Sequence, residues 1–219
     1  MRNPPANPLD GDGGPALDAD LNGPGAITGD ASGNIFFADH ERPDIIHEGH
    51  EVFGNVAIRR IDAATRVLST VVGTNMFGWT GDGYPAAGNP SFPVISLAVS
   101  PPRPGAPNGE LHFGVQGYVT AGGSSAPLQF DLVRKVDGAG LLDTVVGREE
   151  SHETINASCV AQPAIRVLLR EASSLAFLAE ELHYAERPAN VVYRVVGADD
   201  TIVAEPGTMA ELTQVEVWP

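Results

Sequence analysis

The sequence predicts an all-β protein, and three observations support that prediction. Glycine and proline contribute 25 and 18 of the 219 residues, more than an average globular chain contains, which favours short elements joined by many turns. The chain has no uninterrupted apolar run of roughly 18 residues, the length that indicates a transmembrane helix. Short runs with β character also return in the same order three times along the chain.

Each repeat contains four short runs, separated by Gly, Asp, Asn or Pro. Alternation supports strands, because Ile35 and Phe37 would lie on one face of the second run and Phe36 and Ala38 on the other. The runs of the three repeats span residues 26–30, 34–39, 56–62 and 68–73; 95–99, 110–115, 131–137 and 141–147; and 174–179, 181–186, 191–196 and 201–207.

Matches at single residues indicate that the repeats are copies of one unit. The third runs read IRRID at 58–62, VRKVD at 133–137 and VYRVV at 192–196. The fourth runs of the first two copies read STVVG at 69–73 and DTVVG at 143–147. Strand sequences therefore persist between copies, whereas the loops between them vary in length.

Four-stranded units in tandem are typical of a β-propeller, in which each blade covers the faces of its neighbours. We therefore expect a single domain, a partial propeller of three four-stranded blades with one extra C-terminal strand. Residues 164–172 fit either a short amphipathic helix or a loop. The expected bounds are 1–219 for the domain, about 21–74, 90–148 and 172–207 for the blades, and 213–219 for the extra strand.

The loop sequences add a family resemblance. GDGGPA at 11–16 returns as GDGYPA at 81–86, and the first copy is followed by AITGDASGNIFFAD and AIRRIDAATRVLSTVVGT. This pattern resembles the NHL repeat, in the variety found in bacterial extracellular proteins and teneurin-like propellers, and it covers residues 11–147 more closely than 148–219. The resemblance implies a propeller, usually of six blades, with an extracellular or periplasmic location. It transfers no catalytic residue to this chain.

Three blades do not close a ring, and an open ring exposes sheet faces and strand edges. We therefore expect either that this chain is part of a longer protein or that it forms a homo-oligomer. In the second case a dimer would complete a six-bladed ring, and the strand at 213–219 would clasp the partner copy.

Charge and cysteine content exclude several classes of function. The chain has 28 Asp and Glu residues against 13 Lys and Arg, a net charge of −15. Such a chain repels phosphate backbones and anionic lipids, so we expect no nucleic-acid partner, and the lack of a long apolar run argues against membrane insertion. Cys159 is the single cysteine, which rules out an internal disulfide and a zinc site built from several cysteines.

Two loops contain residue types that bind metals. Asp10 and Asp12 lie in a glycine-rich loop, where Ca²⁺ could find oxygen ligands, although the spacing is not that of an EF-hand. Alternatively, Asp12 holds the turn through hydrogen bonds to the backbone. His47 and His50 lie in an insertion of the first unit and fit either Zn²⁺ ligands or a solvated loop. We predict no cofactor, with Ca²⁺ or Zn²⁺ as the alternatives at these two places.

Histidines at matching positions are the first candidates for ligand binding. His112 and His183 each follow a Glu-Leu pair, where the first unit has Phe36. Near the axis of a ring they would resemble the metal-lined sites of propeller-type peptidyl-α-hydroxyglycine α-amidating lyases; alternatively they pack as Phe36 does. Aromatic residues near the second GDG loop either close the core between blades or form a recognition patch: Phe77, Trp79 and Tyr84.

Motifs for catalysis are missing from the sequence, which contains no Gly-x-Ser-x-Gly elbow and no phosphate-binding glycine loop before a helix. We expect a non-catalytic binding or scaffold module that recognises a protein or glycan partner, or that self-assembles through blade edges. One alternative is a metal-dependent lyase or hydrolase with histidines at a central channel. Another is a structural subunit of an extracellular filament.

Overall fold

Strands dominate the structure of this chain. Apart from a short 3₁₀ turn, η1 (Ala16–Asp18), the regular structure in the described residues is all strand, so the predicted all-β class is confirmed. In the same residues no helix is long and apolar enough to cross a membrane. The computed structural model describes residues 11–41, 45–47, 50–52, 55–74, 80–119, 128–147, 169, 172–186, 191–196 and 211–214.

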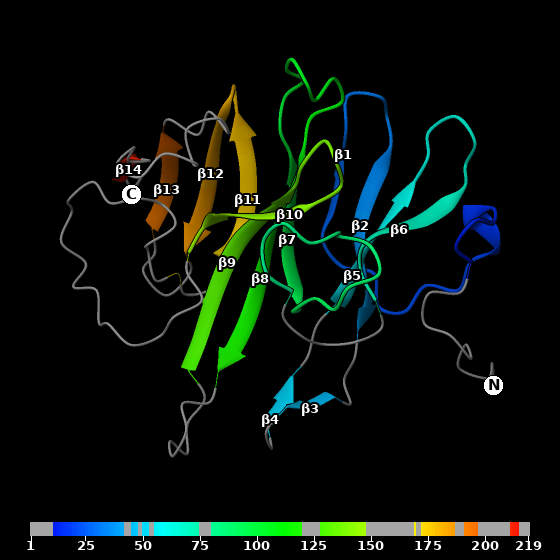
Figure 1. Cartoon of the computed structure of the whole chain (residues 1–219), viewed down its shortest axis with the longest axis horizontal. Coiled ribbons are helices and arrows are strands. Elements are labelled where there is room, and N and C mark those ends of the chain that lie inside the picture. Colours follow the sequence, from blue (N-terminus) through cyan, green and yellow to red (C-terminus); the bar gives the residue numbers. More distant parts are fainter. Residues whose placement is uncertain are drawn as a thin grey trace.

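Three groups of four antiparallel strands follow one another along the chain, and we call them units 1, 2 and 3 (Figure 1). Unit 1 contains β1 (Ile27–Gly29), β2 (Ile35–Glu41), β5 (Asn55–Ile61) and β6 (Leu68–Gly73). Unit 2 contains β7 (Val94–Val99), β8 (Leu111–Val119), β9 (Leu128–Val136) and β10 (Leu142–Val146). Unit 3 contains β11 (Ala172–Leu178), β12 (Glu181–Glu186), β13 (Val191–Val196) and β14 (Glu211–Gln214).

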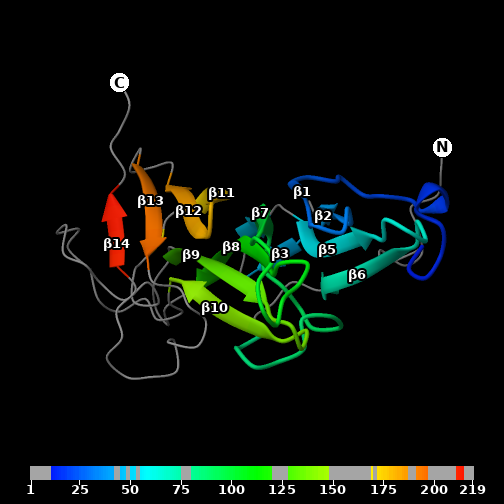
Figure 2. The same cartoon turned by 90° about the horizontal axis from the view of Figure 1, so that it is seen from above.

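The units lie in succession, with unit 2 between units 1 and 3 (Figure 2). Asn55 of β5 pairs with Val94 of β7, which joins units 1 and 2 into one eight-stranded sheet. The insertion in unit 1 forms its own hairpin from β3 (Ile45–His47) and β4 (His50–Val52). No closed ring of sheets is formed by the residues that the structure describes.

The C-terminal strand differs from the expected arrangement. An extra strand was expected at 213–219, outside the three units, but β14 pairs with β13, with Val195 opposite Leu212. It thereby supplies the fourth strand of unit 3, which the sequence assigns to 201–207, a segment outside the described residues. Pairing with β13 satisfies backbone groups that an unpaired edge strand would leave exposed.

Each GDG loop is bound to the fourth strand of the unit that follows it. Gly13 N–H donates to the Leu68 carbonyl over 2.8 Å, and Leu68 N–H donates to the Gly14 carbonyl over 2.9 Å. The second loop repeats the pattern, since Gly83 N–H donates to the Leu142 carbonyl over 2.8 Å. Gly13 and Gly83 have φ values of +81° and +80°, a conformation that favours glycine. The repeated loop sequence therefore encodes a repeated contact.

Unit 2 buries apolar side chains on both faces, because it packs against a unit on each side. Leu97 and Leu132 belong to the core shared with unit 1. Their neighbours Ala98 and Val133 belong to the core shared with unit 3. This alternation follows from the period of two along a strand and stacks the units face to face.

Unit 3 is attached to unit 2 at the first residue of β11. The Ala172 N–H donates to the Asp131 carboxylate over 2.8 Å, and the Ala172 carbonyl accepts the Ser96 hydroxyl over 3.0 Å. Gly114 allows this approach, because a Cβ there would lie 2.4 Å from Ser96 Oγ and 3.1 Å from the Ala172 oxygen. Residues far apart in sequence thus fix the seam between units 2 and 3. Leu169 of the 164–172 segment bridges Asp131 in an antiparallel pairing.

Candidate functional site

Several residues singled out from the sequence lie outside the described part of the structure. This applies to Asp10, Phe77 and Trp79, and to the side chains of His47 and His50. The backbone of the hairpin is described, and it places His47 directly opposite His50. Within the described residues no group of three or more His, Cys, Asp or Glu side chains is arranged to hold a metal ion.

Asp12 binds to its own unit. Its carboxylate accepts from Arg59 Nη2 over 2.7 Å and from the Thr70 N–H over 3.1 Å. The Arg59 side chain is fully buried and also lies 3.3 Å from Asp39. Asp12 therefore holds the loop against β5 and β6.

The second GDG loop repeats this arrangement. Asp82 accepts from Arg134 Nη2 and from Thr144 Oγ1, each over 2.9 Å. Tyr84 in the same loop is 59% exposed, and its carbonyl accepts the Leu142 N–H. The tyrosine side chain thus lies at the surface beside a loop that is bound through its backbone.

His112 and His183 occupy matching positions in units 2 and 3. The Nδ1 of His112 lies 3.0 Å from the Glu110 carbonyl, and the Nδ1 of His183 lies 3.1 Å from the Glu181 carbonyl. A basic residue faces each histidine across the sheet, Lys135 for His112 and Arg194 for His183. Unit 1 has Phe36 at the matching position, and a basic residue, Arg60, again lies opposite it on the neighbouring strand.

Unit 3 covers His112. The imidazole is 5% exposed and packs edge-on against the Phe177 ring of β11, with the ring centroids 4.9 Å apart. His183 lies one unit further along and does not line the cavity beside His112. The two histidines therefore do not share this cavity.

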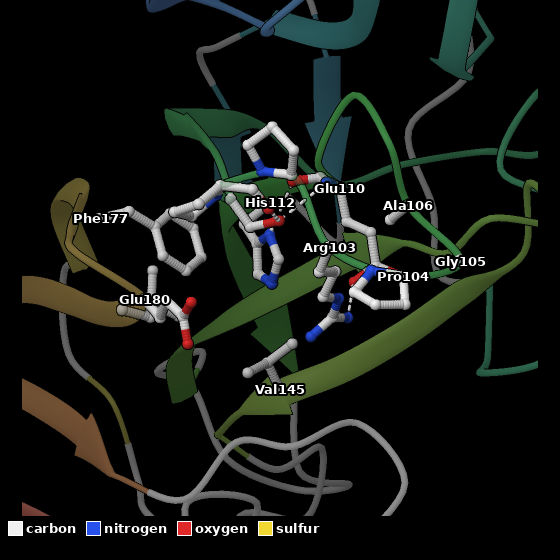
Figure 3. A pocket seen from close by; sticks show the side chains of 13 residues that line it. Arg103, Pro104, Gly105, Ala106, Glu110, His112, Val145, Phe177 and Glu180 are labelled. Carbon is white, nitrogen blue, oxygen red and sulfur yellow. Dashed lines mark hydrogen bonds and ion pairs between the residues drawn. The ribbon is translucent and has the colours of Figure 1, made fainter.

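A cavity of about 520 Å³ lies beside His112, at the seam between units 2 and 3. One wall is the proline-rich loop of residues 100–106, and Glu110, His112 and Val145 of unit 2 continue it. Phe177, Glu180 and Leu182 of unit 3 form the opposite wall. Figure 3 shows the His112 ring extending into this space between Phe177 and Glu180 on one side and Arg103 on the other. We call this space the seam cavity.

Charges near the floor of the seam cavity are largely paired. Glu110, which is 8% exposed, forms an ion pair with Arg103 and lies 3.7 Å from Lys135 Nζ. Lys135 also lies 4.0 Å from Asp143, whose pKa is raised because burial disfavours the charged carboxylate. Glu180 is exposed on the opposite wall.

His112 is uncharged at neutral pH. Burial lowers its pKa to about 4, and the positive charges of Lys135 and Arg103 act in the same direction, against the hydrogen bond to the Glu110 backbone. Because a carbonyl oxygen only accepts, Nδ1 carries the ring proton and donates to Glu110. Nε2 is therefore a hydrogen-bond acceptor.

Sequence reasoning identified His112 but missed the other residues of the seam cavity. Arg103 is the only basic residue in the predicted insertion at 100–109, which was a usable signal. Phe177 and Glu180 carry no such signal, because their role depends on how unit 3 packs against unit 2. No protein-family model matches the chain, and a search of curated proteins also gave no match.

Proposed function

We propose that this chain is a non-catalytic binding module of the NHL-propeller type, and that it holds its ligand in the seam cavity. The observation that carries the proposal is the cavity of about 520 Å³ between units 2 and 3. Its size falls within the range of small-molecule sites, and its lining combines an apolar surface with a few polar groups. His112 stands on β8, and Arg103, Glu110 and Glu180 lie in the connections next to strands of units 2 and 3.

The state of the titratable groups favours binding over catalysis. An efficient general base has a pKa near the working pH, whereas the pKa of His112 is about 4. Glu110 is held between two cations, Arg103 and Lys135. These groups are suited to fixing the orientation of a ligand rather than to moving protons.

The propeller type is supported by the repeats and by the way the units stack. GDG loops bind the fourth strand of units 1 and 2 in the same manner, and the faces of unit 2 are both covered. In a propeller each blade contacts its neighbours in this way. We further propose that additional units, from a second copy or from a longer chain, complete the ring.

Binding without turnover tests this function. The chain is exposed to immobilised neutral glycans and synthetic peptides, and bound ligands are then eluted and weighed by mass spectrometry. We expect saturable binding to at least one ligand, with its mass unchanged. A product of altered mass, or no binding to either class, would refute the proposal.

A further inference from the structure

The Nε2 atom of His112 is an acceptor that the described residues leave without a hydrogen-bond partner. The side chain makes one hydrogen bond, through Nδ1, and one ring contact, with Phe177. The residue is 5% exposed and its ring extends into the seam cavity (Figure 3). The atom faces the seam cavity, so a ligand group that donates a hydrogen bond can reach it there.

Charges around the seam cavity select against an ionic donor. The positive groups near His112, Arg103 and Lys135, disfavour a cation at Nε2, as they disfavour a proton there. The exposed carboxylate of Glu180 lines the same cavity and repels an anion. An uncharged hydroxyl group is repelled neither by the positive groups nor by the carboxylate.

The remaining lining suits the carbon skeleton of a ligand. Phe177 and Leu182 of unit 3 and Val145 of unit 2 line the cavity, and prolines of the 100–106 loop add further apolar surface. A sugar ring has C–H groups on its faces, which pack against aromatic and aliphatic side chains, and hydroxyls around its rim. Glu180, exposed at the opposite wall, offers a second acceptor for such hydroxyls.

We propose that the seam cavity binds an uncharged sugar ring of a glycan, with one hydroxyl donating a hydrogen bond to Nε2 of His112. This inference rests on the proposed binding function and narrows its ligand to one chemical class. His112 acts here as a ligand-contacting residue, and Phe177 supplies the surface against which the ring packs.

The test begins with the unmodified protein and a set of sugars that differ in charge. Glucose, galactose, mannose and N-acetylglucosamine are titrated as neutral methyl glycosides, with glucosamine as the cation and glucuronate as the anion. Binding is followed by NMR, using backbone amides together with the side-chain nitrogens of His112. We expect at least one neutral sugar to bind, to shift Nε2, and to bind at least tenfold more tightly than its charged counterparts.

Two matched variants locate the contact. His112→Phe introduces the residue that unit 1 has at the matching position, Phe36, and so keeps an aromatic ring while removing the acceptor. It should weaken sugar binding about tenfold, the value of one hydrogen bond of ordinary strength. His183→Phe makes the same change outside the seam cavity and should leave the dissociation constant within about twofold. If His112→Phe does not fold, the charge series on the unmodified chain still decides the question.

The outcomes separate this inference from the proposed function. Binding of a peptide but of no sugar would overturn the inference and leave the binding module standing. Equal affinity for neutral and charged sugars, or sugar binding that survives His112→Phe unchanged, would also overturn it. Failure of both peptides and glycans to bind would overturn the proposed function as well.

Discussion

Units 2 and 3 present the same local sequence in two environments. Each has a Glu-Leu-His run with the histidine Nδ1 against the carbonyl two residues earlier, and each faces a basic residue across the sheet. In unit 2 the ion pair of Lys135 and Glu110 is buried, with side-chain exposures of 5% and 9%. The corresponding pair of Arg194 and Glu181 in unit 3 is 36% and 41% exposed.

The difference shows that a neighbouring unit, rather than the local sequence, makes the site. β11 covers the face of unit 2 that bears His112, and the seam cavity forms where the cover is incomplete. In unit 3 the matching residues Glu181, His183 and Arg194 remain half-buried. Four substitutions in unit 2, two of them with a matched substitution in unit 3, would break or sharpen this comparison, beginning with the largest expected effect.

Removing the buried cation should give the largest loss. Lys135→Met leaves the buried Glu110 carboxylate with Arg103 alone, and we expect the free energy of unfolding to fall by about 3 kcal/mol. The matched change, Arg194→Met, breaks an exposed pair and should cost less than about 1 kcal/mol. Urea unfolding of both variants measures the difference. Equal losses of unfolding free energy would mean that burial beneath unit 3 does not strengthen the Lys135–Glu110 ion pair.

The second largest loss of stability is expected from filling the space between Gly114 and β11. Gly114→Ala places a methyl group 2.4 Å from Ser96 Oγ, in the face that packs against β11. Unit 3 carries Ala185 at the matching position, two residues after His183. We expect Gly114→Ala to lower the free energy of unfolding by about 2 kcal/mol through overpacking. If calorimetry finds its melting temperature unchanged, the close approach of Ala172 to Gly114 is incorrect.

The buried imidazole should make stability depend on pH. The unfolded chain protonates His112 near its ordinary pKa of 6.5, whereas the folded protein resists protonation until about pH 4. Between these values the unfolded state binds more protons, so stability falls as the pH falls. From pH 7.5 to 4.5 this loss amounts to about 2 kcal/mol.

His112→Phe should remove this part of the pH dependence. Denaturant titrations at several pH values compare the variant with the parent chain, and the difference between the two curves isolates His112. Parallel curves from pH 7.5 to 4.5 would mean that His112 titrates normally and is not desolvated by unit 3.

The smallest effect is expected at a single hydrogen bond of the seam. Ser96→Ala removes the hydroxyl that donates to the Ala172 carbonyl over 3.0 Å, at a cost of about 1 kcal/mol. Ser174, at the matching position of unit 3, is exposed, and Ser174→Ala should have almost no effect. Thermal unfolding compares the two alanine variants, and a larger loss for Ser174→Ala would reverse the comparison.

The sequence predicted strand positions well, because they depend on short-range patterns. Alternation at 34–39 and the repeated run of IRRID and VRKVD correspond to β2, β5 and β9. The role of the C-terminal strand was missed, because β14 repeats no earlier run and is recognised by its pairing with β13. The NHL resemblance and the completed ring remain predictions.

Only one residue of the candidate site, His112, was predicted from the sequence. His112 stood out because it recurs as His183. Its surroundings depend on side chains brought from 65 residues further along the chain, as Phe177 is, and no local pattern specifies such contacts. The depressed pKa of His112 likewise follows from burial, which is a property of the packed units.

The loops that begin each of the first two units also set an order of folding. Asp12 binds Arg59 and Thr70, 47 and 58 residues later, and Asp82 binds Arg134 and Thr144, 52 and 62 residues later. These contacts form after the whole intervening segment is in place, and such long separations slow folding. During synthesis, unit 1 is therefore completed only after β6 has left the ribosome, and unit 2 only after β10. Each of these two units is thus closed by residues that precede its own first strand.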